Sequence, residues 1–193
     1  MSARFPDFRL GRVLATSFTG TLSERHGDPV ERIPTPGRLV DWLTVSGLAV
    51  ESATAAQLDR ARELREAIHE AATAAAQQDP LPAAAVEVIN DFSTQGRASA
   101  VLTPEGGRRW RLSSASAVDD ALGVAAADAI SVLAGERDGK LSLCASPTCR
   151  AAFFDTSQSR SRRWCDMGTC GNREKKARFL ANQRKNGEPE GRP

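Results

Sequence analysis

The residues best suited to chemistry are the four cysteines of the chain, which lie late in the sequence as two pairs of equal spacing. Four residues separate Cys144 from Cys149, and the same gap separates Cys165 from Cys170. A gap of this length lets the chain fold back so that both sulfurs face one ion, and the fifteen residues between the pairs bring the second pair round. The spacing predicts one tetrahedral Zn2+ held by Cys144, Cys149, Cys165 and Cys170.

Such a zinc site is structural, because four thiolates fill the tetrahedron and leave no position for water or substrate. The alternatives are disulfides or small buried thiols. The sequence shows no secretory signal and no apolar run long enough to cross a membrane. We therefore expect a cytoplasmic protein in a reducing compartment, where zinc binding is favoured over disulfides.

The net charge of +2 conceals an asymmetry between the two parts of the chain. Residues 1–143 contain 15 Lys and Arg against 19 Asp and Glu, a net charge of −4, whereas residues 144–193 contain 11 against 5, a net charge of +6. An acidic body with a basic end is typical of a module that binds phosphates, although a basic surface can also be merely solvated.

Basic and amide side chains flank the second cysteine pair, in an arginine-rich turn before Trp164 and in a helix expected after Cys170. A helix that begins beside the metal adds the partial positive charge of its N-terminus. Guanidinium groups bind phosphate bidentately and can also contact guanine edges in the major groove. The predicted DNA contacts are Arg160, Arg162, Arg163, Asn172, Arg173, Lys175, Lys176 and Arg178.

The elements that must position these residues form a small module. An apolar stretch over residues 151–155 predicts a short strand between the cysteine pairs, and high helix propensity follows the second pair. The order of knuckle, strand, knuckle and helix is treble-clef-like. The small core is expected to consist of Phe153, Phe154, Trp164, Ala177, Phe179 and Leu180.

Two helices of the body have recognisable starts. Thr35 and Pro36 are a typical N-cap and first helical residue, and that helix should end at Gly47. A longer helix is predicted over residues 54–78, because apolar residues recur there at helical spacing. Its buried stripe comprises Leu58, Ala61, Leu64, Ile68, Ala72 and Ala75. Its solvent side comprises Glu63, Arg65, Glu66 and Glu70.

The rest of the body combines helices with a hairpin. Helical spacing returns over residues 83–93 and 117–134, and Asp119 and Asp120 lie in the first turn of the latter helix, where the dipole favours them. Between these helices, two strand-like runs flank the glycine-containing turn 104–107, which predicts a β-hairpin. The predicted fold class is mainly α with a β-hairpin (α+β).

The chain is thus expected to have three parts. Residues 1–138 form a mostly helical N-terminal domain, and residues 139–185 form the small four-cysteine zinc finger. The polar segment 186–193 is expected to be a disordered tail.

The cysteine-rich part resembles the CGNR zinc-finger family, which is named for the string from Cys170 to Arg173. The likeness covers about fifty residues and includes residues 144–149 (CASPTC), Phe154, Asp155, Ser157, residues 162–173 (RRWCDMGTCGNR) and Lys175.

The body resembles the ABATE domain, which typically precedes such fingers, in residues 14–22, 35–43 and 64–68. It differs in having Ser17 and Gly20 where the opening motif of that family usually has an aspartate and an asparagine, so no ligand role is carried over to this segment. The resemblance implies a stress-induced transcription regulator of bacteria.

Charge and resemblance together favour a zinc-containing regulator that binds duplex DNA through its finger, while the helical body senses a signal or dimerises. Phosphate neutralisation would supply most of the affinity. A single small module has limited reach, so a homodimer would favour tight specific binding. The N-terminal domain could bind a small-molecule ligand, and no membrane partner is expected.

Two other functions remain open. The finger could bind protein or RNA, because charge alone does not separate DNA from RNA. The helical domain could instead hold an enzyme pocket, with the zinc purely structural. The sequence has no nucleophile motif or glycine-rich phosphate loop, and its two histidines, His26 and His69, have no catalytic partner at a suitable spacing. The chain is therefore expected not to be an enzyme.

Overall fold

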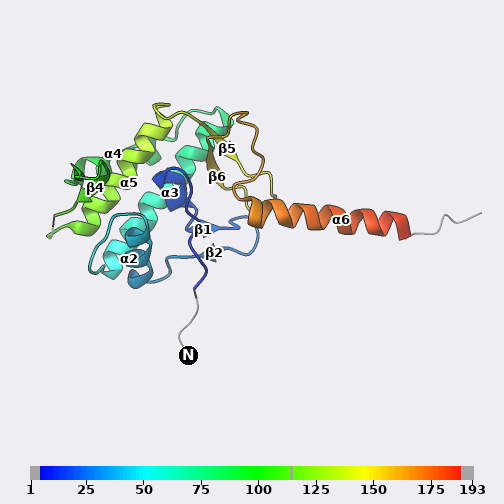
Figure 1. The fold of residues 1–193 in the computed structure, drawn as a ribbon, viewed down its shortest axis with the longest axis horizontal. Helices are drawn as coiled ribbons and strands as arrows, with labels where there is room; N and C mark the ends of the chain where they lie inside the picture. The colour runs from blue at the N-terminus through cyan, green and yellow to red at the C-terminus, as the bar shows by residue number, and fades with distance from the viewer. Residues whose placement is uncertain (1–4, 114, 188–193) are drawn as a thin grey trace, which may run out of the picture.

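The body of the protein is a bundle of helices around one apolar core (Figure 1). The computed structural model describes residues 5–113 and 115–187. The core lies where Phe18 and Trp42 stack at 4.7 Å between ring centroids, and it continues through Leu64 and Leu122. The helices that surround it are α1 (Leu14–Thr19), α2 (Pro36–Val45), α3 (Ala55–Gln77), α4 (Ala83–Gln95) and α5 (Ala117–Leu133).

Local capping fixes the start of α2, as predicted, and a capping box that was not predicted fixes the start of α3. The Thr35 hydroxyl accepts a hydrogen bond from the backbone N–H of Arg38. Thr54 and Gln57 form a reciprocal capping box, in which each side chain accepts from the backbone N–H of the other residue. These contacts satisfy N–H groups that the first helical turn leaves without partners.

The prediction that Arg65 lies on the solvent side of α3 is wrong. Arg65 is buried, with 3% of its surface exposed, and its guanidinium contacts Thr21, Glu31 and Glu66. A long charged side chain can cross the bundle when acceptors line its path, and helical spacing alone does not reveal such acceptors. Within the described ranges, no helix is both long enough and apolar enough to cross a bilayer.

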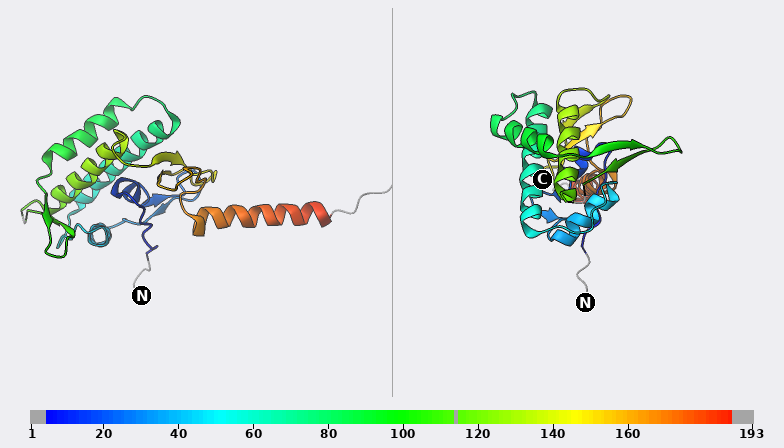
Figure 2. Two further views of the ribbon diagram at one scale, coloured as in Figure 1. Left: turned by 45° about the horizontal axis from the view of Figure 1, so that its top comes forward. Right: turned by 90° about the vertical axis from the view of Figure 1, so that its left-hand side faces the viewer.

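The strands form three antiparallel pairs in the described part of the chain. The hairpin of β3 (Ser99–Leu102) and β4 (Arg108–Arg111) confirms the prediction, and it extends away from the helices (Figure 2, right). β1 (Leu22–Ser23) pairs with β2 (Val30–Glu31). β5 (Lys140–Leu143) pairs with β6 (Ala152–Asp155), which matches the strand expected between the cysteine pairs.

The C-terminal helix leaves the body as an isolated rod. A π-helical turn, η1 (Met167–Gly171), leads into α6 (Asn172–Gly187), which projects away from every other element (Figure 1). Phe179 is 61% exposed and Leu180 is 44% exposed, and Ala177 is exposed as well. The prediction that these residues pack on the zinc core is wrong, because only the first turn of α6 lies beside the finger.

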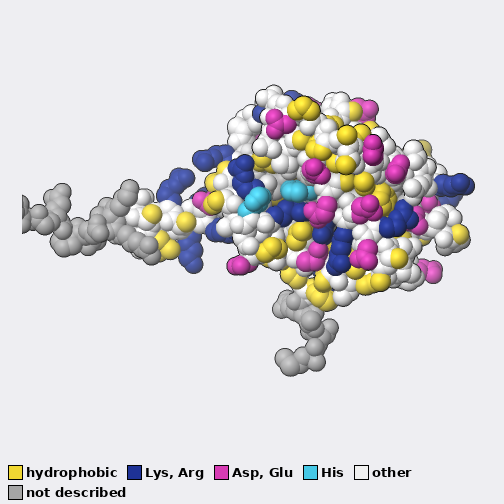
Figure 3. All heavy atoms as spheres, turned by 180° about the vertical axis from the view of Figure 1, so that it is seen from behind, with side chains coloured by type: hydrophobic (Ala, Val, Ile, Leu, Met, Phe, Trp, Pro, Cys, Tyr) yellow, Lys and Arg dark blue, Asp and Glu magenta, His cyan; other side chains and the backbone are white. Residues whose placement is uncertain are grey.

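The segment that was predicted to be a disordered tail begins inside α6. α6 continues to Gly187, two residues into the segment 186–193, and residues 188–193 lie outside the described residues. Seen from behind, the described part of the rod carries several Lys and Arg side chains, whereas most of the acidic side chains lie on the body (Figure 3). The charge asymmetry of the sequence is therefore also an asymmetry in space.

Candidate metal centre and its junction with the body

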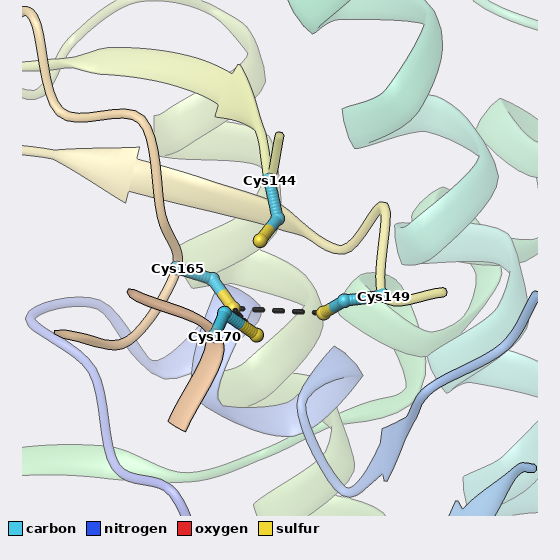
Figure 4. Close-up of side chains that lie close together, drawn as sticks. All are labelled: Cys144, Cys149, Cys165 and Cys170. Carbon is cyan, nitrogen blue, oxygen red and sulfur yellow. Dashed lines mark hydrogen bonds between the residues drawn. The ribbon is translucent and has the colours of Figure 1, made fainter. Parts of the chain in front are cut away.

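The four cysteines converge from separate segments of the finger (Figure 4). Cys144 directly follows β5, Cys149 lies in the turn before β6, Cys165 ends the arginine-rich loop, and Cys170 belongs to η1. Their sulfur atoms all lie within 4.8 Å of one another, and the Sγ atom of Cys165 is 3.6 Å from that of Cys149 and from that of Cys170. All four are free thiols.

This arrangement fits a zinc ion in both geometry and charge. Zn–S bonds of about 2.3 Å in a tetrahedron place the sulfurs about 3.8 Å apart, close to the observed separations. Hydrogen bonds from Cys149 and Cys165 lower the pKa of the Cys144 thiol. The hydrogen bond to Cys144 raises the pKa of Cys165, and burial raises that of Cys170. A divalent cation would relieve this competition among neighbouring thiols, so the cluster could hold one structural zinc ion.

Backbone hydrogen bonds to two aspartates shape the loops that carry the second cysteine pair. The carboxylate of Asp155, fully buried at the end of β6, accepts from the N–H groups of Ser157 and Arg162, both at 2.9 Å. Hydrogen bonding from Ser157, followed by that from Arg162, lowers the pKa of Asp155. Asp166 accepts from the N–H of Thr169 at 2.6 Å and caps η1. The loop before Cys165 and the turn that contains Cys170 are both fixed in this way.

The neighbouring residues Arg162 and Arg163 have different surroundings. The guanidinium of Arg162 donates to the carbonyl oxygens of Trp164 and Cys165, at 2.9 and 2.5 Å, and therefore holds the chain beside a zinc ligand. The exposed side chain of Arg163 lies over the Trp164 ring, 5.2 Å from its centroid.

A polar network joins the finger to the body at the first turn of α6. Arg173 donates to both carboxylate oxygens of Glu24 and to the hydroxyl of Thr148. Hydrogen bonding from Arg173 lowers the pKa of Glu24 against the opposing effect of burial. Glu24 in turn raises the pKa of Arg173. The backbone N–H of His26 also donates to the carbonyl of Thr148, at 3.0 Å. The cysteine knuckle and the turn between β1 and β2 are thereby held together.

An apolar contact extends the same junction. Phe154 packs with Val13 before α1 and Val132 in α5, and Leu141 lies against this cluster. The prediction placed Phe154 in a core belonging to the finger alone, but its ring is shared with the body. Gly139 is needed for this close packing, because a Cβ atom there would lie 2.4 Å from the ring.

Two family models match the sequence, one over the helical body and the other over the finger. Residues 12–136 match the ABATE model, described as "Putative stress-induced transcription regulator", and residues 140–183 match the CGNR zinc finger. The chain belongs to the ABATE family. The resemblance seen in the sequence is therefore confirmed for both parts. No curated protein matches the sequence.

The structure divides the predicted DNA contacts of this ABATE protein into two groups. The first group has partners within the chain: Arg160 pairs with Asp138, Asn172 donates to the carbonyl of Gly168, and Arg162 and Arg173 have the partners described above. The second group has exposed side chains without an ion pair among the described residues. The second group comprises Arg163, Lys175, Lys176 and Arg178.

The sequence analysis of the ABATE protein missed the roles of Glu24, Asp155 and Asp166. Asp155 followed two residues later by Ser157, and Asp166 three residues before Thr169, are local patterns of side-chain capping and could have been found. The role of Glu24 depends on a residue 149 positions away, and no local signal indicates it.

His69, in α3, is the partly buried member of the two histidines in this ABATE protein. Burial, followed by the nearby positive charge of Arg25, lowers the pKa of His69 to about 4, so its imidazole is neutral near pH 7. The buried Nδ1 atom of His69 has no hydrogen-bond partner among the described residues. The two matched families, a transcription regulator and a zinc finger, are not enzyme families.

Proposed function

We propose that this ABATE protein regulates transcription by binding duplex DNA through its C-terminal helix, with the zinc finger holding that helix on the body. The observation that carries the proposal is the exposed basic rod α6, which begins beside the zinc cluster and projects from the body (Figure 1). An α-helix is about 10–12 Å wide with its side chains, and the DNA major groove is about 12 Å wide.

The charges on α6 suit this role. Lys175, Lys176 and Arg178 are exposed, and Glu174 is the one acidic residue from Asn172 to Gly187. These three side chains are proposed to contact phosphates on both sides of the groove, together with Arg163 on the neighbouring loop. Arg173 and Arg162 are proposed to act indirectly, by fixing the start of α6 and the loop before it.

The shape of the major groove favours DNA over double-stranded RNA as the partner of α6. The major groove of A-form RNA is deep and too narrow for side chains to read, so a projecting helix suits B-form DNA better.

A single helix covers few base pairs, and a homodimer that presents two rods would extend the contact surface.

The test is a salt series with zinc-loaded protein and sheared genomic duplex DNA, with the bound DNA recovered and sequenced. Three phosphate contacts predict that replacing Lys175, Lys176 and Arg178 by Gln makes the negative slope of log K against log salt less steep by about 3. The matched control replaces Arg108, Arg109 and Arg111 of the distant β4 strand, and its slope should equal that of the wild type.

Failure of wild-type protein to retain DNA at low salt would overturn the proposal. Equal slopes for the α6 variant and the β4 variant would also overturn it, because affinity would then not depend on the rod. Competition by duplex RNA as strong as that by duplex DNA would favour the RNA-binding alternative instead.

A further inference from the structure

A cavity of about 620 Å3 lies between the N-terminal segment and the finger. One wall is the backbone and side chains of residues 8–12, together with Thr16, Gly20 and Ser23. The other wall is the zinc knuckle and β6, including Cys149, Phe153 and Phe154. The N-terminal ribbon, in pale blue, passes beside the cysteines in Figure 4. The cavity therefore lies at the same junction between body and finger as the ion pair of Arg173 and Glu24, but other residues line it.

Positive charge surrounds this cavity. Arg9, Arg12 and Arg162 line it, against the single carboxylate of Asp166, which is occupied in capping η1. In the ranges that the structure describes, neither Arg9 nor Arg12 forms an ion pair. Arg9 and Arg12 thus line the cavity without an ion pair of their own.

A fourth arginine lies directly behind the wall. Arg32 is 4% exposed, and all its hydrogen bonds are to neutral acceptors: Ser23 Oγ at 2.7 Å and the carbonyl oxygens of Asp7 and Val30. Burial, followed by the charge of Arg9, lowers the pKa of Arg32, which shows that the two positive groups lie near each other. The carboxylates of Glu24 and Glu31 act on Arg32 in the opposite direction, but their ion pairs are with Arg173 and Arg65. Burying a cation without an ion pair is costly, and an anion in the cavity would offset part of that cost.

The zinc site balances part of this charge but not all of it. Cys149 and Cys165 line the cavity, and Zn2+ with four thiolates carries a net charge of −2. Glu24 and Glu31 lie near these arginines but are neutralised by Arg173 and Arg65. The four arginines, this −2 and the carboxylate of Asp166 then leave a net charge of about +1. The arginines therefore exceed what compensation of the zinc site requires.

The remaining wall includes the apolar residues Phe8, Phe153 and Phe154. A volume of about 620 Å3 is within the usual range for small-molecule sites, which combine apolar walls with a few polar groups. We propose that this junction cavity binds a small organic anion, a carboxylate or phosphate attached to an apolar group, with Arg9 and Arg12 as its charged contacts.

An anion bound there would contact both the N-terminal segment and the finger, and it would strengthen the attachment of one to the other. The finger also carries the start of α6, so such a ligand would change how firmly the rod is held. This regulatory consequence rests on the proposed DNA-binding function, whereas binding of the anion does not.

The test is isothermal titration of the zinc-loaded full chain with benzoate and with phenyl phosphate. Benzamide, which lacks the charge, and inorganic phosphate, which lacks the ring, are the control probes. Replacing Arg9 and Arg12 by Gln should weaken binding of benzoate or phenyl phosphate at least tenfold. The matched variant, with Arg109 and Arg111 of β4 replaced by Gln, should bind as the wild type does. Zinc content is measured for every variant.

The absence of saturable binding of either anion to the wild type would overturn the proposal, and so would equal affinities for the two double variants. Loss of zinc from the Arg9 and Arg12 variant, without anion binding by the wild type, would mean that these arginines only compensate the thiolates. If the Arg9 and Arg12 variant instead loses affinity for DNA, while the wild type binds no anion, these arginines belong to the DNA-binding surface. Anion binding by a protein that does not bind DNA would leave this proposal standing and remove only the DNA-binding function.

Discussion

Arg173 at the start of α6 forms a bidentate ion pair with Glu24, which lies in the turn between β1 and β2. The two Nη atoms donate to the carboxylate at 2.5 and 2.8 Å, and Thr148 of the cysteine knuckle donates to the same carboxylate at 2.9 Å. Glu24 has a φ of 56°, a left-handed conformation that costs a non-glycine residue about 1 kcal/mol or more. Three segments distant in sequence are thus held at one carboxylate.

Arg173→Ala should lower the free energy of unfolding by about 1–2 kcal/mol, because it leaves the carboxylate of Glu24 with Thr148 as its remaining side-chain partner. This loss is smaller than is usual when a buried ion pair is broken, because the side chain of Arg173 is 40% exposed and water screens the pair. Urea denaturation of the zinc-loaded protein measures the change.

Lys175→Ala is the control, because this exposed residue of the same helix should change stability by less than about 0.5 kcal/mol. A double-mutant cycle with Glu24→Gln then isolates the pair. If the effects of Arg173→Ala and Glu24→Gln simply add, the two residues do not stabilise the junction through each other.

The same pair predicts how stability depends on pH. Hydrogen bonding from Arg173 lowers the pKa of Glu24 below its ordinary value of 4.5, although burial acts in the opposite direction. A carboxylate whose pKa is lower in the folded state contributes its full stabilisation above 4.5 and loses it as the pH falls through the folded value. The difference in unfolding free energy between wild type and Glu24→Gln should therefore shrink on acidification below pH 4.5. A difference that stays constant with pH would contradict this assignment.

Sequence analysis succeeded where short-range signals determine the structure. The helical spacing from residue 54 onward, the Thr35 and Pro36 helix start and the spacing of the cysteines all act within a few residues. It failed where partners come from elsewhere. The burial of Arg65 depends on acceptors supplied by Thr21 and Glu31, and helical spacing does not encode their position.

The direction of α6 is a similar failure. Ala177 and Leu180, three residues apart, have the helical spacing of core residues, and Phe179 adjoins Leu180. The helix nevertheless departs from the finger after its first turn, so no other element covers these side chains. Pattern alone indicates which face of a helix is apolar, and it does not indicate whether another element lies against that face.

Removal of the metal should unfold the finger and leave the helical core folded. Cys170→Ser, or a chelator, should abolish binding of one zinc per chain, because the three remaining thiolates lose much of the affinity of a closed four-thiolate site. NMR amide signals from residues 140–171 should lose dispersion, while those of α3 and α5 persist. Metal analysis gives the stoichiometry. A finger that keeps its dispersed signals without zinc would show that the apolar junction at Phe154 suffices to fold it.

Arg162 and Arg163 are adjacent but should respond differently to substitution by Ala. Loss of the Arg162 guanidinium removes the donors to the carbonyls of Trp164 and Cys165, so zinc affinity should fall by about tenfold or more. Arg163→Ala should keep the wild-type zinc affinity and weaken binding to DNA. Competition with a chromogenic chelator measures the first effect. Equal zinc affinities for the two variants would show that Arg162 does not support the metal site.

Asp120 should be among the most sensitive polar positions of the body, although its place in the first turn of α5 indicated only a favourable interaction with the helix dipole. Its fully buried carboxylate accepts from the N–H groups of Arg97 and Ser113, at 3.0 and 2.6 Å. These two residues flank the β3–β4 hairpin, so one side chain ties both ends of the hairpin to α5.

Asp120→Ala leaves these N–H groups without acceptors and should cost about 2–4 kcal/mol in unfolding free energy. Asp119→Asn, one position earlier and partly exposed beside Arg60, should cost less than about 1 kcal/mol. Hydrogen exchange adds a readout specific to the hairpin, because loss of its anchor should speed exchange in β3 and β4 more than in α3. A uniform change in exchange across the body would instead mean that Asp120 stabilises the core as a whole.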